Sequence, residues 1–230
     1  MTEPTERTEP TERWRLRRPW IAAGAAAVVL AGAGFGWWWK WDHTPAEVPE
    51  SACWSVLTGE DLKPFAEQAH GTFLDDPSQG AHPRLQPDHG YIDCVLRSKS
   101  GESLLWVQVL SETETIVKDD YGPDAEKAKQ GYSRLDFGAD VQGWVRRQTV
   151  QAVFRCDNPQ LADSRTPYVS VGVASGTAVD GTSKRTHRAD LDIALKYIKA
   201  VAASYPCTNP LHLPETVPES APNFPSLADP

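Results

Sequence analysis

The sequence predicts an α+β domain with a mainly antiparallel sheet packed by a long C-terminal helix, preceded by one transmembrane helix. Three observations support this prediction: an uncharged apolar run at residues 20–39, short alternating segments between residues 91 and 174, and an amphipathic segment at residues 186–204. Strand patterns that follow one another, with few helical patterns between them, favour antiparallel pairing. The 230 residues are enough for one domain with flanking segments.

The apolar run at residues 20–39 has the properties of a membrane span. As a helix, its twenty residues would reach across the hydrocarbon core of a bilayer. Tryptophans stand at both ends, and four arginines lie directly before it: Arg13, Arg15, Arg17 and Arg18. Basic residues before a span place that side in the cytoplasm. We therefore expect a disordered cytoplasmic tail at residues 1–19, a transmembrane helix at 20–39 and a linker at 40–52.

A cleaved signal peptide is the alternative interpretation of the same run. The small residues Ala31, Gly32 and Ala33 suit a cleavage site, with the cut after Ala33. The run is rich in alanine and glycine, which lowers its hydrophobicity and keeps this alternative open. Both alternatives export the chain beyond the run, so we expect residues 53–207 to form an extracytoplasmic domain.

Four cysteines follow the apolar run and none precedes it: Cys53, Cys94, Cys156 and Cys207. An even number of cysteines in an exported domain favours disulfides over free thiols. Zinc sites need two ligands a few residues apart, a spacing that these cysteines lack. We favour Cys53–Cys94 and Cys156–Cys207, because each bond would tie a cysteine near a helix to a strand. The other two pairings remain open.

Two segments have the apolar spacing of amphipathic helices. Thr58 begins the first helix, since Asp61 follows three residues later as in a capping box, and His70 with Gly71 ends it. The second helix runs over 186–204, with one apolar stripe formed by Leu191, Leu195, Ile198 and Ala202. We also expect a short charged helix at residues 123–130, with Pro123 in its first turn.

Alternating and continuous apolar segments predict the strands. The segments 91–98 and 103–111 are typical of a hairpin, joined by a turn at Lys99, Ser100 and Gly101. The second of them has apolar side chains on both faces, so we expect it to be central and covered on each side. Two or three strands follow within 133–156, and one more at 167–174 turns Val169, Val171 and Val173 inward.

The region beyond Cys207 has six prolines in residues 208–230 and no apolar period. This composition predicts a disordered, Pro-rich tail.

The charge distribution excludes some classes of partner. Residues 42–230 carry 17 basic and 27 acidic side chains, whereas residues 1–41 carry six basic and four acidic ones. Nucleic-acid binding requires clustered lysine and arginine, which an acidic domain lacks. We expect no nucleic-acid partner, a membrane contact through residues 20–39, and an envelope protein as the partner of the outer domain.

Motifs for catalysis or metal binding are absent from the sequence. The weak candidates are a metal group of His82, Asp88 and His89, the paired carboxylates Asp75–Asp76 and Asp119–Asp120, the pair Arg146–Arg147, and a ligand pocket lined by Trp54, Trp106 and Trp144. Turn capping, solvent exposure and core packing explain these residues without a site. We therefore expect no catalytic residue, cofactor or metal.

The segment from Cys53 to Leu62, the cysteines at 94 and 156, and the alanine-rich helix before Tyr205-Pro206-Cys207 resemble a known group of proteins. These are uncharacterised cell-envelope proteins of actinobacteria whose outer domain opens with a cysteine followed closely by Leu-Thr-x-x-Asp-Leu. The resemblance covers residues 53–207 and implies an anchored extracytoplasmic domain. It carries over no catalytic residue, and many members are lipoproteins, whereas this chain has an apolar span.

The leading hypothesis is therefore a membrane-anchored, non-enzymatic interaction or binding module of the cell envelope. The alternative is a small-molecule or lipid carrier with a pocket between the sheet and the C-terminal helix. An envelope hydrolase is the third hypothesis.

Overall fold

The structure, a computed structural model, describes residues 48–68, 74–75, 91–98, 101–122, 132–146, 148–157, 167–176, 179, 183–205 and 207–219. These residues form an α+β domain with an antiparallel sheet and a long C-terminal helix, which confirms the predicted class. No helix among the described residues is long and apolar enough to cross a membrane. The predicted span at residues 20–39 lies outside the described residues.

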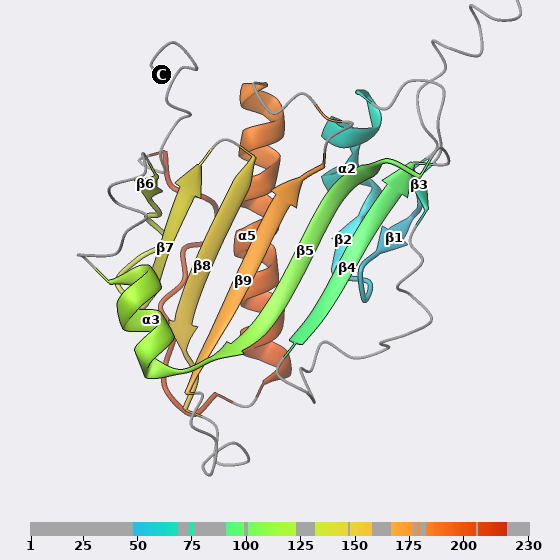
Figure 1. Cartoon of the computed structure of the whole chain (residues 1–230). Helices are drawn as coiled ribbons and strands as arrows, with labels where there is room; N and C mark the ends of the chain where they lie inside the picture. Colours follow the sequence, from blue (N-terminus) through green and yellow to red (C-terminus); the bar gives the residue numbers. More distant parts are fainter. Residues whose placement is uncertain are drawn as a thin grey trace, which may run out of the picture. The chain divides into compact units, whose positions relative to one another are not determined.

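Seven strands form the main sheet in the order β3-β4-β5-β9-β8-β7-β6, and every neighbouring pair is antiparallel (Figure 1). The strands are β3 (Leu74–Asp75), β4 (Tyr91–Ser98), β5 (Ser103–Glu112), β6 (Ser133–Arg134), β7 (Val141–Arg146), β8 (Thr149–Arg155) and β9 (Tyr168–Ser175). Strand β9 lies at the centre and joins the β4–β5 hairpin to the β7–β8 hairpin. The predicted 91–98 and 103–111 hairpin is thus confirmed.

The alternation of valines with other residues along β9 indicates which face of the sheet is buried. Val169, Val171 and Val173 are at most 1% exposed, as the sequence predicts, and they turn toward the C-terminal helix. Side chains of successive strand residues point to opposite faces, so Gly172 and Ala174 lie on the other face. Burying a valine contributes roughly 1.5–3 kcal/mol, which makes this strand a large contributor to the core.

Helix α5 (Lys184–Ser204) covers one face of the sheet, where it contacts β8 and β9 (Figure 1). The Oγ atom of Ser183 accepts the backbone N–H of Thr186 and caps the first turn. The apolar stripe packs on the sheet through buried residues that include Leu191, Ala194, Leu195, Ile198 and Val201. The helix predicted over 186–204 is therefore confirmed.

Two disulfides close the domain at opposite ends of its chain. They join Cys53 to Cys94 and Cys156 to Cys207, with Cα–Cα distances of 5.6 and 4.8 Å. This is the pairing that the sequence favoured. The first bond ties the start of the domain to β4, and the second ties the chain after α5 to the end of β8.

The described part of the chain begins with a small hairpin of β1 (Ser51–Ala52) and β2 (Leu57–Thr58) around a left-handed turn. Cys53, Trp54 and Ser55 have consecutive φ values of +50°, +62° and +61°. Such residues rarely follow one another, because each costs roughly 1–2 kcal/mol. The turn is held by the Cys53 disulfide and by the Tyr197 hydroxyl, which donates to the Cys53 carbonyl at 3.1 Å.

Two helices differ from the sequence prediction. Helix α2 (Gly59–Ala66) follows Thr58 as predicted, with the Asp61 carboxylate accepting the Thr58 backbone N–H at 2.7 Å, but it ends before residue 70. Helix α3 (Glu114–Tyr121) was not predicted. Its cap is Thr113, whose Oγ1 accepts the backbone N–H of Ile116 at 3.2 Å. The helix expected at residues 123–130 lies outside the described residues.

Residues 207–219 pack against the domain, whereas the sequence predicts a disordered tail from residue 208. The Val217 side chain is 2% exposed and belongs to the core. Lys199 Nζ donates to the Glu215 carbonyl at 2.8 Å, and an Arg188 guanidinium nitrogen donates to the Val217 carbonyl at 2.7 Å. The segment therefore returns along α5, from its end toward its beginning. Residues 220–230 lie outside the described part of the chain.

The left-handed turn makes a testable prediction at Ser55, whose side chain is exposed. Replacing Ser55 by glycine removes the Cβ that conflicts with a φ of +61°, and this gain exceeds the entropy that glycine loses on folding. We expect Ser55→Gly to raise the free energy of unfolding by about 1 kcal/mol relative to Ser55→Ala, measured by chemical denaturation. Equal stability of the two variants would contradict this account of the turn.

Candidate binding face

The face of the sheet that meets α5 is filled with side chains. Val107, Val109 and Val171 from the sheet and Ala194 and Ile198 from the helix are all 0% exposed. Interiors packed at this level have little room for a ligand. The space that the carrier hypothesis assigns to a pocket is therefore occupied by core residues.

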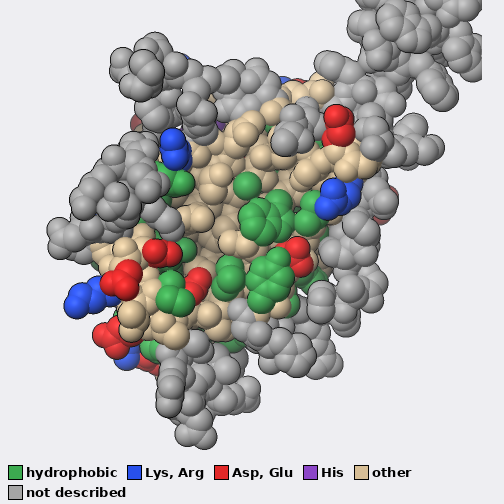
Figure 2. Space-filling view, in the orientation of Figure 1, with side chains coloured by type: hydrophobic (Ala, Val, Ile, Leu, Met, Phe, Trp, Pro, Cys, Tyr) green, Lys and Arg blue, Asp and Glu red, His purple; other side chains and the backbone are tan. Residues whose placement is uncertain are grey.

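The opposite face of the sheet carries a set of residues that are half-buried or exposed, apart from Gly172, which is buried. We call this set the binding face: Tyr91, Asp93 and Val95 of β4, Trp106, Gln108 and Leu110 of β5, Gly172 and Ala174 of β9, and Thr149 and Gln151 of β8. Figure 2 shows hydrophobic side chains gathered over β4 and β5 on this face. Tyr91 is 46% exposed, which is high for a large aromatic side chain.

A row of polar residues crosses the middle of the binding face. The strand register places Asp93, Gln108, Gly172 and Gln151 next to one another on four adjacent strands. A Cβ at Gly172 would lie 2.9 Å from Gln108 Cγ, so this position needs a glycine for the Gln108 side chain to lie across β9. Gln151 Oε1 is buried and has no hydrogen-bond partner. Such an acceptor is uncommon and points to a missing donor.

Helix α3 bounds the binding face on the β7 side. Val117 and Tyr121 of the helix pack on Trp144 and Val153, which are 4% and 1% exposed. The indole N–H of Trp144 donates to the Asp120 carbonyl at 2.9 Å. Helix α3 thus covers the part of this side of the sheet near β7. The sequence predicts that both faces of β5 are covered, but Trp106 and Leu110 of β5 are half-buried on this side.

The three tryptophans of the predicted ligand pocket do not lie together. Trp54 packs on the helix side, edge-on to the Tyr197 ring with centroids 6.2 Å apart. Trp106 belongs to the binding face, and Trp144 lies under α3. Sequence reasoning therefore identified one residue of the binding face, Trp106, but assigned it to the predicted ligand pocket.

The remaining sequence candidates supply no cluster of catalytic or metal-binding groups within the described part of the chain. Asp119 and Asp120 are exposed at the end of α3. Arg146 lies over the Tyr132 ring, 5.0 Å from its centroid. Among the described residues no group of three or more histidines, cysteines or acidic residues is placed to hold a metal. Outside the described side chains lie Asp75, Asp76, His82, Asp88, His89 and Arg147.

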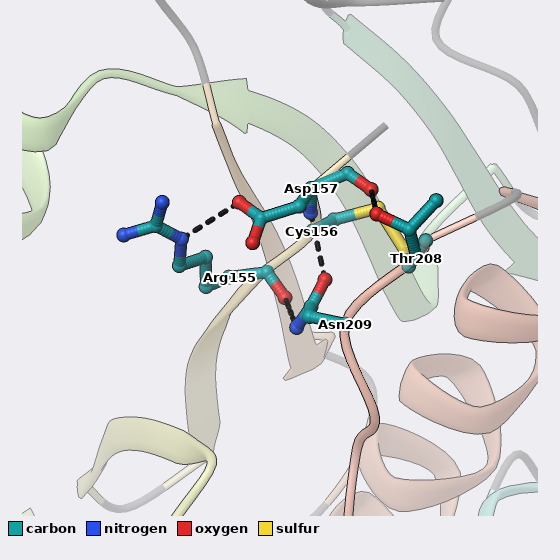
Figure 3. Close-up of polar contacts among 6 residues, drawn as sticks. Arg155, Cys156, Asp157, Thr208 and Asn209 are labelled. Carbon is teal, nitrogen blue, oxygen red and sulfur yellow. Dashed lines mark hydrogen bonds and ion pairs between the residues drawn. A yellow bond between two sulfur atoms is a disulfide. The ribbon is translucent and has the colours of Figure 1, made fainter. Parts of the chain in front are cut away.

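A cavity of about 350 Å³ lies at the end of β8, beside Arg155, Tyr168 and Asn209. The Asn209 amide bridges the strand end: its nitrogen donates to the Arg155 carbonyl at 2.9 Å, and its oxygen accepts the Asp157 backbone N–H at 2.7 Å (Figure 3). Arg155 Nε is also paired, with an Asp157 carboxylate oxygen at 2.7 Å. These polar groups hold the segment after Cys207 against the end of β8. This structural role explains why they lie beside the cavity.

The most unusual titratable group is Asp190, on the face of α5 that packs against the sheet. Its side chain is 1% exposed, and burial raises its pKa to about 8 even though a hydrogen bond from Ser175 favours the charged form. Ser175 Oγ lies 2.8 and 2.7 Å from the two carboxyl oxygens. One hydroxyl proton cannot serve both contacts, whereas a protonated carboxyl donates back to Ser175 and completes the pair.

The Ser175–Asp190 pair combines a hydroxyl with an acid of raised pKa, which is the chemistry that the hydrolase hypothesis requires. His187 is also buried, one turn earlier on α5, at 4% exposure. These groups lie inside the core, with Ser175 only 8% exposed, so a substrate has no access to them in this conformation. Sequence reasoning missed Asp190, although an acidic residue in phase with Ala194 and Ile198 on an apolar stripe was a readable signal.

The raised pKa of Asp190 predicts how stability changes with pH. Between about pH 4 and pH 8 the folded state holds one proton more than the unfolded state, because the unfolded carboxyl has a pKa of 3.8. The contribution of Asp190 to the free energy of unfolding therefore falls as pH rises through this range. Asp190→Asn does not titrate at this position, so we expect the free energy of unfolding of this variant, relative to that of the natural chain, to increase from pH 4 to pH 8.

Urea unfolding of the two proteins at several pH values measures this difference. Parallel pH profiles of the two proteins would show that Asp190 is ionised in the folded state, against this prediction.

Comparison with known proteins gives no family for this chain: no family model, no curated protein and no solved structure matches it. The function therefore has to be argued from the geometry of the described residues. Within them, the binding face is the accessible surface that combines aromatic side chains with an unpaired buried acceptor.

Proposed function

We propose that the protein is a membrane-anchored, extracytoplasmic module of the cell envelope that binds a partner through the binding face and catalyses no reaction. The observation that carries this proposal is the contrast between the two faces of one sheet. One face is filled by α5, while the other presents Tyr91 at 46% exposure, with Trp106 and Leu110 half-buried. Apolar surface left exposed on a folded domain is typical of an interaction site.

The location rests on the sequence and on the disulfides. The apolar run at residues 20–39, with arginines before it, supports an anchor whose amino side is cytoplasmic. Disulfides such as Cys53–Cys94 and Cys156–Cys207 persist in oxidising compartments, which supports placing the domain outside the cytoplasm. The resemblance to actinobacterial envelope proteins agrees with this placement.

The binding hypothesis is favoured over its two rivals by the position of the available groups. A carrier needs free volume beside α5, where Val107 and Ile198 are completely buried. A hydrolase needs polar groups that a substrate can reach, whereas Asp190 and Ser175 are 1% and 8% exposed. The aromatic side chains Tyr91 and Trp106 of the binding face already contact solvent.

Truncation of the aromatic side chains tests the proposal. Full-length protein in detergent is mixed with cell-envelope fragments, and the bound fraction is measured by sedimentation over a range of protein concentrations. We expect Tyr91→Ala and Trp106→Ala each to weaken binding about tenfold, which corresponds to a loss of about 1.4 kcal/mol at a contact residue.

Ile116→Ala is the matched control. Ile116 is the other exposed large hydrophobic residue among the described residues, at 42%, and it lies on α3 outside the binding face. Its truncation should leave binding unchanged, and thermal unfolding shows whether each variant is folded. Equal binding by all four proteins would refute the role of the binding face.

A further inference from the structure

We infer that the ligand of the binding face is an uncharged glycan chain. This inference rests on the proposed function and names the chemical class of the partner. It follows from three properties of the binding face: its low charge, its aromatic side chains, and its row of amides with an unpaired buried oxygen.

The charge of the binding face excludes strongly charged polymers. Asp93 is the one charged side chain in the set, and it lies at the β4 end of the polar row. Just beyond the set lie Arg97 of β4, which is exposed, Glu112 at the far end of β5, and Arg146 of β7, which pairs with Thr149 in the strand register. A face without clustered basic residues does not hold a polyanion, and it is not acidic enough to hold a polycation.

The aromatic side chains require a ligand with apolar surface. Trp106 pairs with Val95 in the strand register, and Tyr91 lies four residues from Val95 along β4. At about 3.4 Å per residue and about 4.8 Å between strands, the two aromatic positions are about 14 Å apart. This distance exceeds one sugar ring, so the ligand spans several units. Sugar rings carry C–H groups on their faces, which pack on aromatic rings, and hydroxyls around their rims.

The glutamine amides of the polar row favour a glycan over a lipid as the ligand. Gln151 Oε1 is buried and has no partner, and Gln108 lies on the other side of Gly172 in the same row. An acyl chain has no hydrogen-bond donor, so it would leave this oxygen unpaired. A sugar hydroxyl donates to the oxygen and accepts from an amide N–H, so one ligand group satisfies both kinds of atom.

The same row argues against a peptide and against a second copy of the chain. Extended peptides bind sheets by adding a strand to an edge, where backbone groups are free, whereas Gln108, Gly172 and Gln151 lie on interior strands whose two edges are paired. Face-to-face packing of two sheets needs apolar inner faces, and this row would place amides at its centre.

Chemical treatment of the envelope fragments distinguishes the ligand classes. Full-length protein in detergent is sedimented with fragments that are untreated, oxidised with periodate and then reduced with borohydride, digested with protease, or extracted with organic solvent. Periodate cleaves the vicinal diols of sugars, so we expect binding to fall at least tenfold after this treatment and to survive the other two. Loss of binding after protease or after solvent extraction, with binding retained after periodate, overturns the inference in favour of a protein or a lipid.

A substitution separates ligand binding from folding. Gln151→Leu removes a buried oxygen that has no partner, so the free protein should be at least as stable as the natural chain in thermal unfolding. Binding to untreated fragments should nevertheless weaken about tenfold, because the ligand hydroxyl loses its acceptor. The control is Gln142→Leu, an exposed glutamine on β7 in register with Val153, which α3 covers. Unchanged binding by Gln151→Leu overturns the inference.

The two experiments keep the inference distinct from the proposed function. If Tyr91→Ala binds untreated fragments as well as the natural chain does, the binding face itself is refuted. If Tyr91→Ala loses binding but periodate has no effect, the binding face stands and the glycan is excluded.

Discussion

Strand β9 carries two hydrogen-bonded ladders, one with β5 and one with β8, and the rest of the described domain is arranged around it. The β4–β5 and β7–β8 hairpins are local structures, and β9 is the strand that joins them into one sheet. Its valines then face α5, which follows β9 in the chain and closes the core. If β9 did not pair on both sides, neither hairpin would have a filled core, because a two-stranded hairpin is marginally stable alone.

The same alternation that builds the core also determines the binding face. The residues of β9 between its valines are small, so the large side chains of the binding face come from the neighbouring strands. Gly172 allows the Gln108 side chain to lie across the backbone of β9, which brings Gln108 and Gln151 to the two sides of one strand. The polar row is therefore a consequence of register, and a shift by one residue would move every member to the other face.

Elements with a strong local pattern were predicted correctly from the sequence, and those that depend on distant contacts were not. The valines of β9, the stripe of α5 and the cysteine pairing follow from short-range periodicity and position. Helix α3 has two buried apolar residues, Val117 and Tyr121, and two such positions are too few to predict an amphipathic helix from the sequence. The packing of residues 207–219 depends on α5, to which Arg188 and Lys199 contribute. Among the residues of the binding face, the sequence singled out Trp106. It could not single out Gln108 and Gln151, because these two residues are brought to the same row only by the pairing of their strands with β9.

One face of the sheet is core, and the other is open to solvent over β4 and β5. Hydroxyl-radical footprinting of the full-length protein, read by mass spectrometry, tests this difference through matched pairs of aromatic residues. Tyr91 is 46% exposed and Tyr197 is 0% exposed, while Trp106 is half-buried and Trp144 is 4% exposed under α3. We expect rapid oxidation of Tyr91 and Trp106, with Tyr197 and Trp144 protected. Protection of Tyr91 and Trp106 to the level of Tyr197 and Trp144 would contradict this difference between the faces.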